Sequence, residues 1–137
     1  MKIIVQKFGG TSVATAEARI AARNKVSEAI KAGFTPAVVV SAMGRKGEPY
    51  ATDSLIEIIK KENSAVDSRD LDTIMCCGEL ISAAVMAASL QSVGINAAAL
   101  TGGQAGIKTD ANFGDAKIRN INPENLLLYM NAGIVPV

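Results

Sequence analysis

The sequence predicts an α/β fold in which a mainly parallel sheet carries helices on both faces. Apolar runs rich in Val and Ile alternate along the chain with longer segments whose apolar residues recur at helical spacing. Glycines and prolines fall between these segments, where turns are expected. Because helical crossovers between strands produce parallel pairing, this alternation predicts a mainly parallel sheet between helices.

The first two strands and the helix between them have the clearest pattern. The run 2–8 is short, apolar and rich in Ile and Val, and it predicts a buried strand. Residues 15–32 predict an amphipathic helix that Thr15 caps and Gly33 ends. The segment TPAVVVSAM at 35–43 predicts a second strand, and its unbroken Val run is typical of a parallel strand buried on both faces.

The rest of the chain continues the alternation. Residues 52–61 predict a helix that begins at Thr52 or Asp53, and a longer helical region is expected over 68–93, interrupted at Gly78. The pattern then predicts a strand at 95–103, a hairpin or flap from extended pieces at 106–110 and 116–121, a helix at 123–133 and a strand at 134–137. Because the last strand ends bare at Val137, we expect the fold to be incomplete at its C-terminus.

Composition and charge argue against several kinds of partner. The 137 residues carry a net charge of +1 and no dense Lys/Arg block, so neither nucleic acid nor a membrane is expected as a partner. No stretch is expected to reach a membrane span of about 18 apolar residues, and no signal peptide precedes the first strand, which predicts a cytoplasmic protein. The chain has no histidine and only two cysteines, so no metal site is expected. These adjacent cysteines, Cys76 and Cys77, are expected to be small buried residues.

The stretch KFGG at 7–10 is the first candidate for chemistry. It falls between the first strand and the following helix, where glycines let an anion approach backbone amides closely. The positive end of the helix dipole favours an anion there. Lys7, at the carboxyl end of the strand, can reach over the turn to the charge of a phosphoryl group. These residues alone leave open a plain tight turn with Lys7 as a solvated strand end.

Several motifs, taken in order, resemble the aspartokinases of the amino-acid kinase superfamily. They are KFGGTSV at 7–13, VVVSAMG at 38–44, TDSL at 52–55, CGELIS at 77–82, LTGGQAGIKT at 100–109, AKI at 116–118 and GIVPV at 133–137. The resemblance covers essentially the whole chain. It implies the amino-acid kinase, carbamate-kinase-like fold, with residues 1–137 as the N-terminal part of the catalytic domain.

The resemblance also implies a reaction. An aspartokinase transfers the γ-phosphoryl group of ATP, bound with Mg²⁺ mainly through its phosphates, to the side-chain carboxylate of L-aspartate. The product, 4-phospho-L-aspartate, leads to lysine, threonine, methionine and diaminopimelate. The family's catalytic aspartate, nucleotide-base loop and regulatory ACT domains have no match in this chain, so the isolated chain is expected to be inactive. The full-length protein is expected to be a homo-oligomer.

Site residues follow from the matched motifs. The resemblance implies that Lys7 is catalytic and stabilises the transferring phosphoryl group. It implies ATP contacts at Lys7, Phe8, Gly9, Gly10 and Ser41, and aspartate contacts at Thr52, Asp53, Ser54 and Glu79. A carboxylate in the apolar stretch around Glu79 is costly to bury without a partner, which independently favours Glu79 as a site residue for the substrate's ammonium group.

Other interpretations of these residues stay open. Ser41 could only hydrogen-bond its own turn, and Thr52 or Asp53 could only cap a helix. The loop after Gly44 is longer than in many family members, so Arg45 or Lys46 could contact an anion instead.

Two other functions also stay open for the chain as a whole. One is a sister kinase for glutamate, acetylglutamate, carbamate or UMP, although Glu79 would have little use with an acceptor that lacks an ammonium group. The other is a non-catalytic module that binds a small molecule, because a fold does not fix a function.

Overall fold

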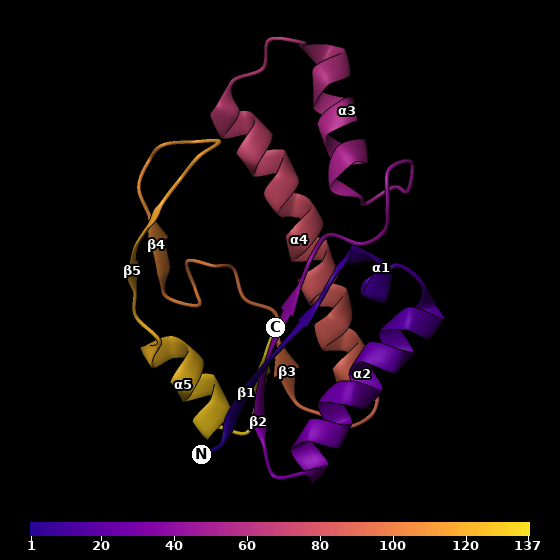
Figure 1. The fold of residues 1–137 in the computed structure, drawn as a ribbon, viewed down its shortest axis with the longest axis vertical. Coiled ribbons are helices and arrows are strands. Elements are labelled where there is room, and N and C mark those ends of the chain that lie inside the picture. The colour runs from indigo at the N-terminus through magenta and orange to yellow at the C-terminus, as the bar shows by residue number, and fades with distance from the viewer.

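The computed structural model describes all residues 1–137 and has six strands and five helices (Figure 1). In chain order these are β1 (Ile3–Phe8), α1 (Gly10–Val13), α2 (Ala16–Lys31), β2 (Thr35–Val40), α3 (Thr52–Glu62), α4 (Ser68–Gln91), β3 (Ala97–Ala98), β4 (Ile107–Thr109), β5 (Ile118–Ile121), α5 (Glu124–Asn131) and β6 (Val135–Pro136). The predicted α/β class is confirmed, since strands alternate with helices and the long strands pair in parallel.

Two parallel strand pairs lie side by side. β1 pairs with β2 over six residues, from Ile3 opposite Thr35 to Phe8 opposite Val40. β3 pairs with β6 in parallel, and β6 packs next to β2. β4 and β5 form the predicted antiparallel hairpin. β3 is much shorter than the predicted strand 95–103, because the chain turns at Thr101, whose carbonyl oxygen accepts from the Ala105 amide (2.9 Å).

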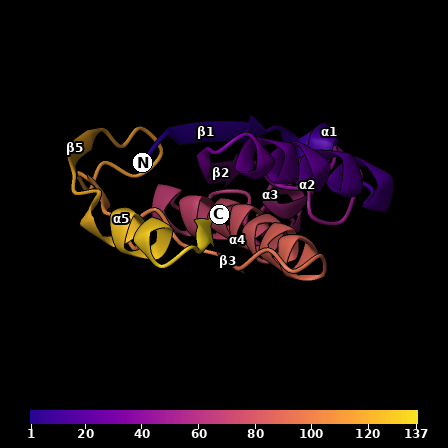
Figure 2. The ribbon, with the colours of Figure 1, turned by 90° about the horizontal axis from the view of Figure 1, so that it is seen from below.

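The core lies where α2 and α4 pack against the strands. Val26 of α2 and Met86 and Leu90 of α4 are completely buried there, together with Val38 of β2. In both Figure 1 and Figure 2, α2 lies on one side of the strands, and α5 with the hairpin lies on the other. Helices therefore lie on either side of the strands, with α5 packed against β6.

The opposite face of the β1–β2 pair is uncovered, contrary to the prediction of strands buried on both faces. Ile3, Val5 and Val39 are 48%, 66% and 46% exposed. Because successive side chains of a strand point to opposite faces, these residues share the face that α2 and α4 do not cover. The unbroken Val run of β2 therefore has one buried side and one open side.

Helix α4 runs through Gly78 without a break, so the predicted interruption is wrong. By length and composition α4 is apolar enough to cross a membrane, contrary to the expectation that no stretch would be. Its position in the fold accounts for this composition, since Met86 and Leu90 are buried among strands. The prediction for the two cysteines is also wrong: Cys76 and Cys77 both lie on exposed parts of α4.

The helix starts differ in how their free amides are satisfied. The hydroxyl oxygen of Thr15 accepts from the Ala18 amide (3.1 Å), which confirms the predicted cap of α2. α3 instead follows Ala51 at its N-cap and has no side-chain cap, so neither Thr52 nor Asp53 caps it. α1 was not expected. It is a single turn that begins at Gly10, directly after the strand that carries Lys7.

Candidate functional site

The loop after β1 and the loop after β2 are hydrogen-bonded to each other at the carboxyl ends of their strands. The Ser41 amide donates to the Phe8 carbonyl oxygen (3.1 Å), and the Gly44 amide donates to the Gly10 carbonyl oxygen (3.1 Å). In open α/β sheets ligands bind beyond the carboxyl ends of the strands. The structure thus brings together Phe8, Gly9, Gly10 and Ser41, which the sequence assigned to one ligand.

Lys7 and Phe8 point to opposite faces of β1. The Lys7 side chain is exposed and lies opposite Val39 on the uncovered face of the sheet. Phe8 packs its ring against the core, and its carbonyl oxygen is taken by Ser41. The Phe8 ring also lines a small pocket with Ser12 and Lys25, whereas the exposed Lys7 ammonium is free to reach a ligand on the other face.

The two glycines of this loop have different surroundings. A Cβ atom added at Gly9 would meet nothing within 4 Å. At Gly10 it would lie 2.7 Å from the Ala42 carbonyl oxygen and 2.9 Å from that of Gly44. Only glycine therefore fits at Gly10 between the two loops. The space beside Gly9 is open, as close approach of a ligand to the backbone requires.

Gly78 lets α3 and the loop after β2 pack closely against α4. A Cβ atom here would lie 2.9 Å from Leu55 Cδ1 and 3.0 Å from the Ala42 Cβ atom. Leu55 belongs to the first turns of α3, close to Thr52, and Ala42 follows Ser41. The absence of a side chain at Gly78 thus lets α3 and the loop after β2 approach α4 directly beside Glu79.

The loop between Gly44 and α3 is held by its own side chains. The Glu48 carboxylate accepts from the Arg45 amide (2.7 Å), and the Ser54 hydroxyl oxygen accepts from the Gly47 amide (3.2 Å). Lys46 forms an exposed ion pair with Glu57 (3.5 Å). Ser54 therefore braces the loop, and Lys46 is directed to α3.

Glu79 lies half-buried on α4 and lines a cavity of about 280 Å³ between α4, β2 and the loop before β4. Its carboxylate makes no hydrogen bond or ion pair with any group of the chain. The other walls include Cys76, Thr101 and Ile107. A half-buried carboxylate without a partner is suited to a cationic group of a ligand. Lys7, Ser41 and residues 52–54 do not line this cavity, but Val39 and Val40, which pair with Lys7 and Phe8 in the sheet, do.

Cys76 is a residue of this cavity that the sequence did not single out. Partial burial raises the pKa of the Cys76 thiol, and the Glu79 carboxylate and Cys77 raise it further. The thiol therefore stays neutral beside the carboxylate. The signal in the sequence was the helical spacing of three residues between Cys76 and Glu79, which places both on one side of α4.

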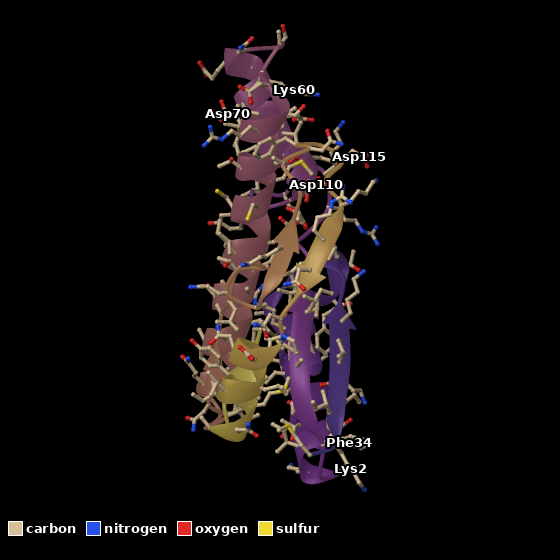
Figure 3. The ribbon with its side chains drawn as sticks, turned by 90° about the vertical axis from the view of Figure 1, so that its left-hand side faces the viewer. Lys2, Phe34, Lys60, Asp70, Asp110 and Asp115 are labelled. Atoms are coloured by element: carbon tan, nitrogen blue, oxygen red, sulfur yellow. The ribbon has the colours of Figure 1, made fainter.

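The β4–β5 hairpin reaches across to the start of α4. The Gly114 amide donates to the Asp72 carboxylate (2.8 Å). Figure 3 shows Asp110 and Asp115 of the hairpin at the same end of the molecule as Asp70, with Lys2 at the other end. Asp110 organises the hairpin loop, and a hydrogen bond from the Lys117 amide lowers the pKa of this exposed carboxyl.

The side chains of the chain form no group of three or more His, Cys, Asp or Glu residues that could hold a metal ion.

Comparison with known proteins places this geometry in a family. The sequence profile described as the amino acid kinase family matches residues 2–137, almost the whole chain. The chain belongs to the amino acid kinase family.

Among the members of this family, the chain is similar to aspartokinases. The chain is 51% identical to Aspartokinase 1 of Bacillus subtilis over 126 residues, which is 92% of this chain and 31% of the relative. It is 39% identical to an aspartokinase of Geobacillus stearothermophilus over its entire length, which is 32% of that protein. The chain thus spans about a third of the length of the curated relatives it matches.

Solved structures agree with the amino-acid kinase fold. The aspartate kinase of Synechocystis superposes with a TM-score of 0.79 at 32% identity, covering 98% of this chain and 21% of that one. The UMP kinase of Bacillus anthracis superposes with a TM-score of 0.64 at 14% identity, covering 98% of this chain and 51% of that one, and it shows the fold alone.

Proposed function

We propose that this chain is the N-terminal part of the catalytic domain of an aspartokinase. The whole protein would transfer the γ-phosphoryl group of ATP to the side-chain carboxylate of L-aspartate and release 4-phospho-L-aspartate. The observation that carries the proposal is the junction at Gly78. There Ala42 of the loop after Ser41 and Leu55 of α3 pack against Gly78 of α4, one residue before the unpartnered Glu79. The 51% identity to an aspartokinase supports the choice of reaction.

In this proposal the loop at the end of β1 binds the phosphates. The Lys7 ammonium neutralises charge that spreads over the phosphoryl group during transfer, which is the main demand of this chemistry. Gly9 and Gly10 let the phosphates approach the backbone, and Ser41 joins them from the neighbouring loop. Mg²⁺ would be bound through the phosphates of ATP, where it neutralises charge.

L-Aspartate would lie nearer to α3 and α4. Glu79 takes its ammonium group, because this carboxylate has no partner within the chain. Thr52, Asp53 and Ser54 stand at the start of α3, where amides without a side-chain cap suit a carboxylate. Holding donor and acceptor in line adds to this charge stabilisation, and no covalent enzyme intermediate is needed.

The proposal extends to the whole protein. It would act in the cytoplasm as a homo-oligomer, on the route to lysine, threonine, methionine and diaminopimelate. The chain of 137 residues alone would not turn over, because residues outside it complete the site.

The test is an assay of acceptor choice with the intact protein. Purified from its native gene, it is incubated with Mg-ATP and L-aspartate, L-glutamate, N-acetyl-L-glutamate or UMP, and each phosphorylated product is measured. We expect phosphorylation of aspartate at least tenfold faster than of the other acceptors. Preferred phosphorylation of another acceptor would assign the protein to a sister kinase. A lack of phosphorylation of all four, with ATP still bound, would favour a binding module.

A paired substitution tests the part given to Glu79. Glu79→Gln should raise the KM for aspartate at least tenfold and leave the KM for ATP within about twofold, since one charged hydrogen bond is worth about 1.5–3 kcal/mol. Glu57→Gln on α3 is the matched control, because Glu57 forms only an exposed ion pair. Equal effects of the two substitutions on the KM for aspartate would contradict the proposal that Glu79 binds aspartate.

A further inference from the structure

Arg19 of α2 connects two loops that the proposed nucleotide site depends on, although no motif includes it. Its guanidinium Nη1 donates to the Val13 carbonyl oxygen and to the Ala14 carbonyl oxygen, both at 2.9 Å. These carbonyl groups close the single turn of α1, which starts at Gly10. Arg19 therefore holds the far end of the segment whose near end is the glycine loop.

The same nitrogen also reaches the loop that follows β2. Nη1 lies 3.8 Å from the sulfur of Met43, a buried residue two positions after Ser41. The glycine loop and this second loop are already linked by the hydrogen bond between Gly44 and Gly10. Arg19, on the third element α2, contacts both the segment that follows the glycine loop and the loop that follows β2. It therefore helps to fix the position of one loop relative to the other.

The guanidinium group of Arg19 donates to carbonyl groups and forms no ion pair with a carboxylate. The side chain is half-buried, and no carboxylate oxygen lies within 4.0 Å of it. A cation next to the carbonyl end of a helical turn is favourable, because this end carries the negative pole of the peptide dipoles. A guanidinium presents its donors in a fixed plane and can serve several acceptors at once, which a flexible ammonium group does less well.

We propose that Arg19 is a positioning residue for ATP: it fixes the glycine loop at Gly9 and Gly10 against the loop of Ser41. This inference rests on the proposed function, because it takes these two loops as the phosphate-binding surface. Arg19 does not touch the phosphates. It acts through the Val13 and Ala14 carbonyl groups and through Met43, and losing it should loosen the site for the nucleotide and leave the aspartate side unchanged.

The experiment compares Arg19→Gln, Arg19→Lys and Arg23→Gln in the intact protein. Arg23 lies one turn further along α2, is also half-buried, and donates to the Ser92 hydroxyl oxygen (3.2 Å), away from both loops. It is thus a matched control for the loss of an arginine from this helix. The KM for ATP, the KM for aspartate and the thermal midpoint are measured for each variant.

We expect Arg19→Gln to raise the KM for ATP about tenfold, which corresponds to about 1.4 kcal/mol, with the KM for aspartate changed less than twofold. Arg19→Lys should recover at least half of this loss on a logarithmic scale, because the ammonium group can still reach the carbonyl groups. Arg23→Gln should leave both KM values unchanged, whatever it does to the thermal midpoint.

An unchanged KM for ATP in Arg19→Gln, or equal rises of both KM values, would overturn the inference and leave Arg19 a structural residue. If Arg19→Gln does not fold, the result from Arg19→Lys decides: its KM for ATP must rise selectively for the inference to stand. Failure of the proposed function would look different, since the unmodified protein would then not phosphorylate aspartate at all.

Discussion

Replacing Gly10 with alanine is the sharpest perturbation of the junction between the two loops. The new Cβ atom would lie 2.7 Å from the Ala42 carbonyl oxygen and 2.9 Å from the Gly44 carbonyl oxygen. Both atoms belong to the backbone, so neither can rotate away as a side chain could. The loops must separate by several tenths of an ångström, and this movement strains the hydrogen bond from the Gly44 amide to the Gly10 carbonyl oxygen.

The expected cost has two parts. Overpacking at a tight backbone contact costs about 1–3 kcal/mol, and a weakened hydrogen bond costs up to about 1 kcal/mol more. Alanine has a higher helix propensity than glycine, and this difference offsets up to about 1 kcal/mol of the cost. The net loss in the free energy of unfolding is therefore about 1–3 kcal/mol. The KM for ATP should rise as well, since Gly9 and Ser41 no longer keep their spacing.

Gly9→Ala is the matched control one residue earlier. No atom lies within 4 Å of its new Cβ, and the backbone there (φ −71°, ψ 170°) accepts any residue. Its stability should stay unchanged or rise by about 0.4–1 kcal/mol, whereas its KM for ATP should rise if phosphates approach this backbone. Urea unfolding and steady-state kinetics of the intact protein measure both effects. A Gly10→Ala protein as stable as Gly9→Ala would refute the packing argument.

Three further predictions concern other parts of the chain. Gly106→Ala should destabilise by at least about 2 kcal/mol, because φ is +87° and the new Cβ would overlap the Asn122 carbonyl oxygen. Gly103→Ala, with its nearest atom at 3.8 Å, should be close to neutral in the same urea experiment. Thr15→Ala removes the cap of α2 and should lower the unfolding free energy by about 1 kcal/mol; a loss below about 0.3 kcal/mol would contradict the cap. The rate at which iodoacetamide alkylates Cys76, followed by peptide mass spectrometry, should be slow at neutral pH and should increase through and above pH 9.0. Burial raises the pKa of the thiol above that ordinary value and keeps the reactive thiolate scarce. A rate that has levelled off by about pH 8 would argue for a low pKa instead.

The sequence carried enough information for the elements that rest on local patterns. Runs of Val and Ile set β1 and β2, and Thr15 marked the start of α2 because its hydroxyl oxygen can satisfy a free amide three residues on. A turn at the glycine loop was predictable, whereas the roles given to Lys7 and Ser41 rest on the resemblance to the aspartokinases and stay predictions, because KFGG alone equally allows a plain tight turn.

Contacts between distant segments could not be predicted in the same way. Gly78 was interpreted as a helix break, because its cost in a helix is a local property, whereas its benefit comes from Leu55 and Ala42. Both cysteines were expected to be buried, since the sequence does not show which side of α4 the strands cover. Nothing in the sequence pointed to Arg19, because its hydrogen-bond partners are backbone carbonyl groups, which every residue carries.

The most direct test of the account is the rate of phosphoryl transfer by a Lys7→Met variant of the intact protein, followed as aspartyl phosphate formed from Mg-ATP and L-aspartate. Lys2→Met is the matched control, because Lys2 is exposed at the opposite end of β1 (Figure 3). If the Lys7 ammonium stabilises the transferring group, kcat should fall about 100-fold or more, with the KM for aspartate nearly unchanged and Lys2→Met fully active. A Lys7→Met protein that keeps its kcat would contradict the assignment of this lysine, and of the loop behind it, to the phosphates.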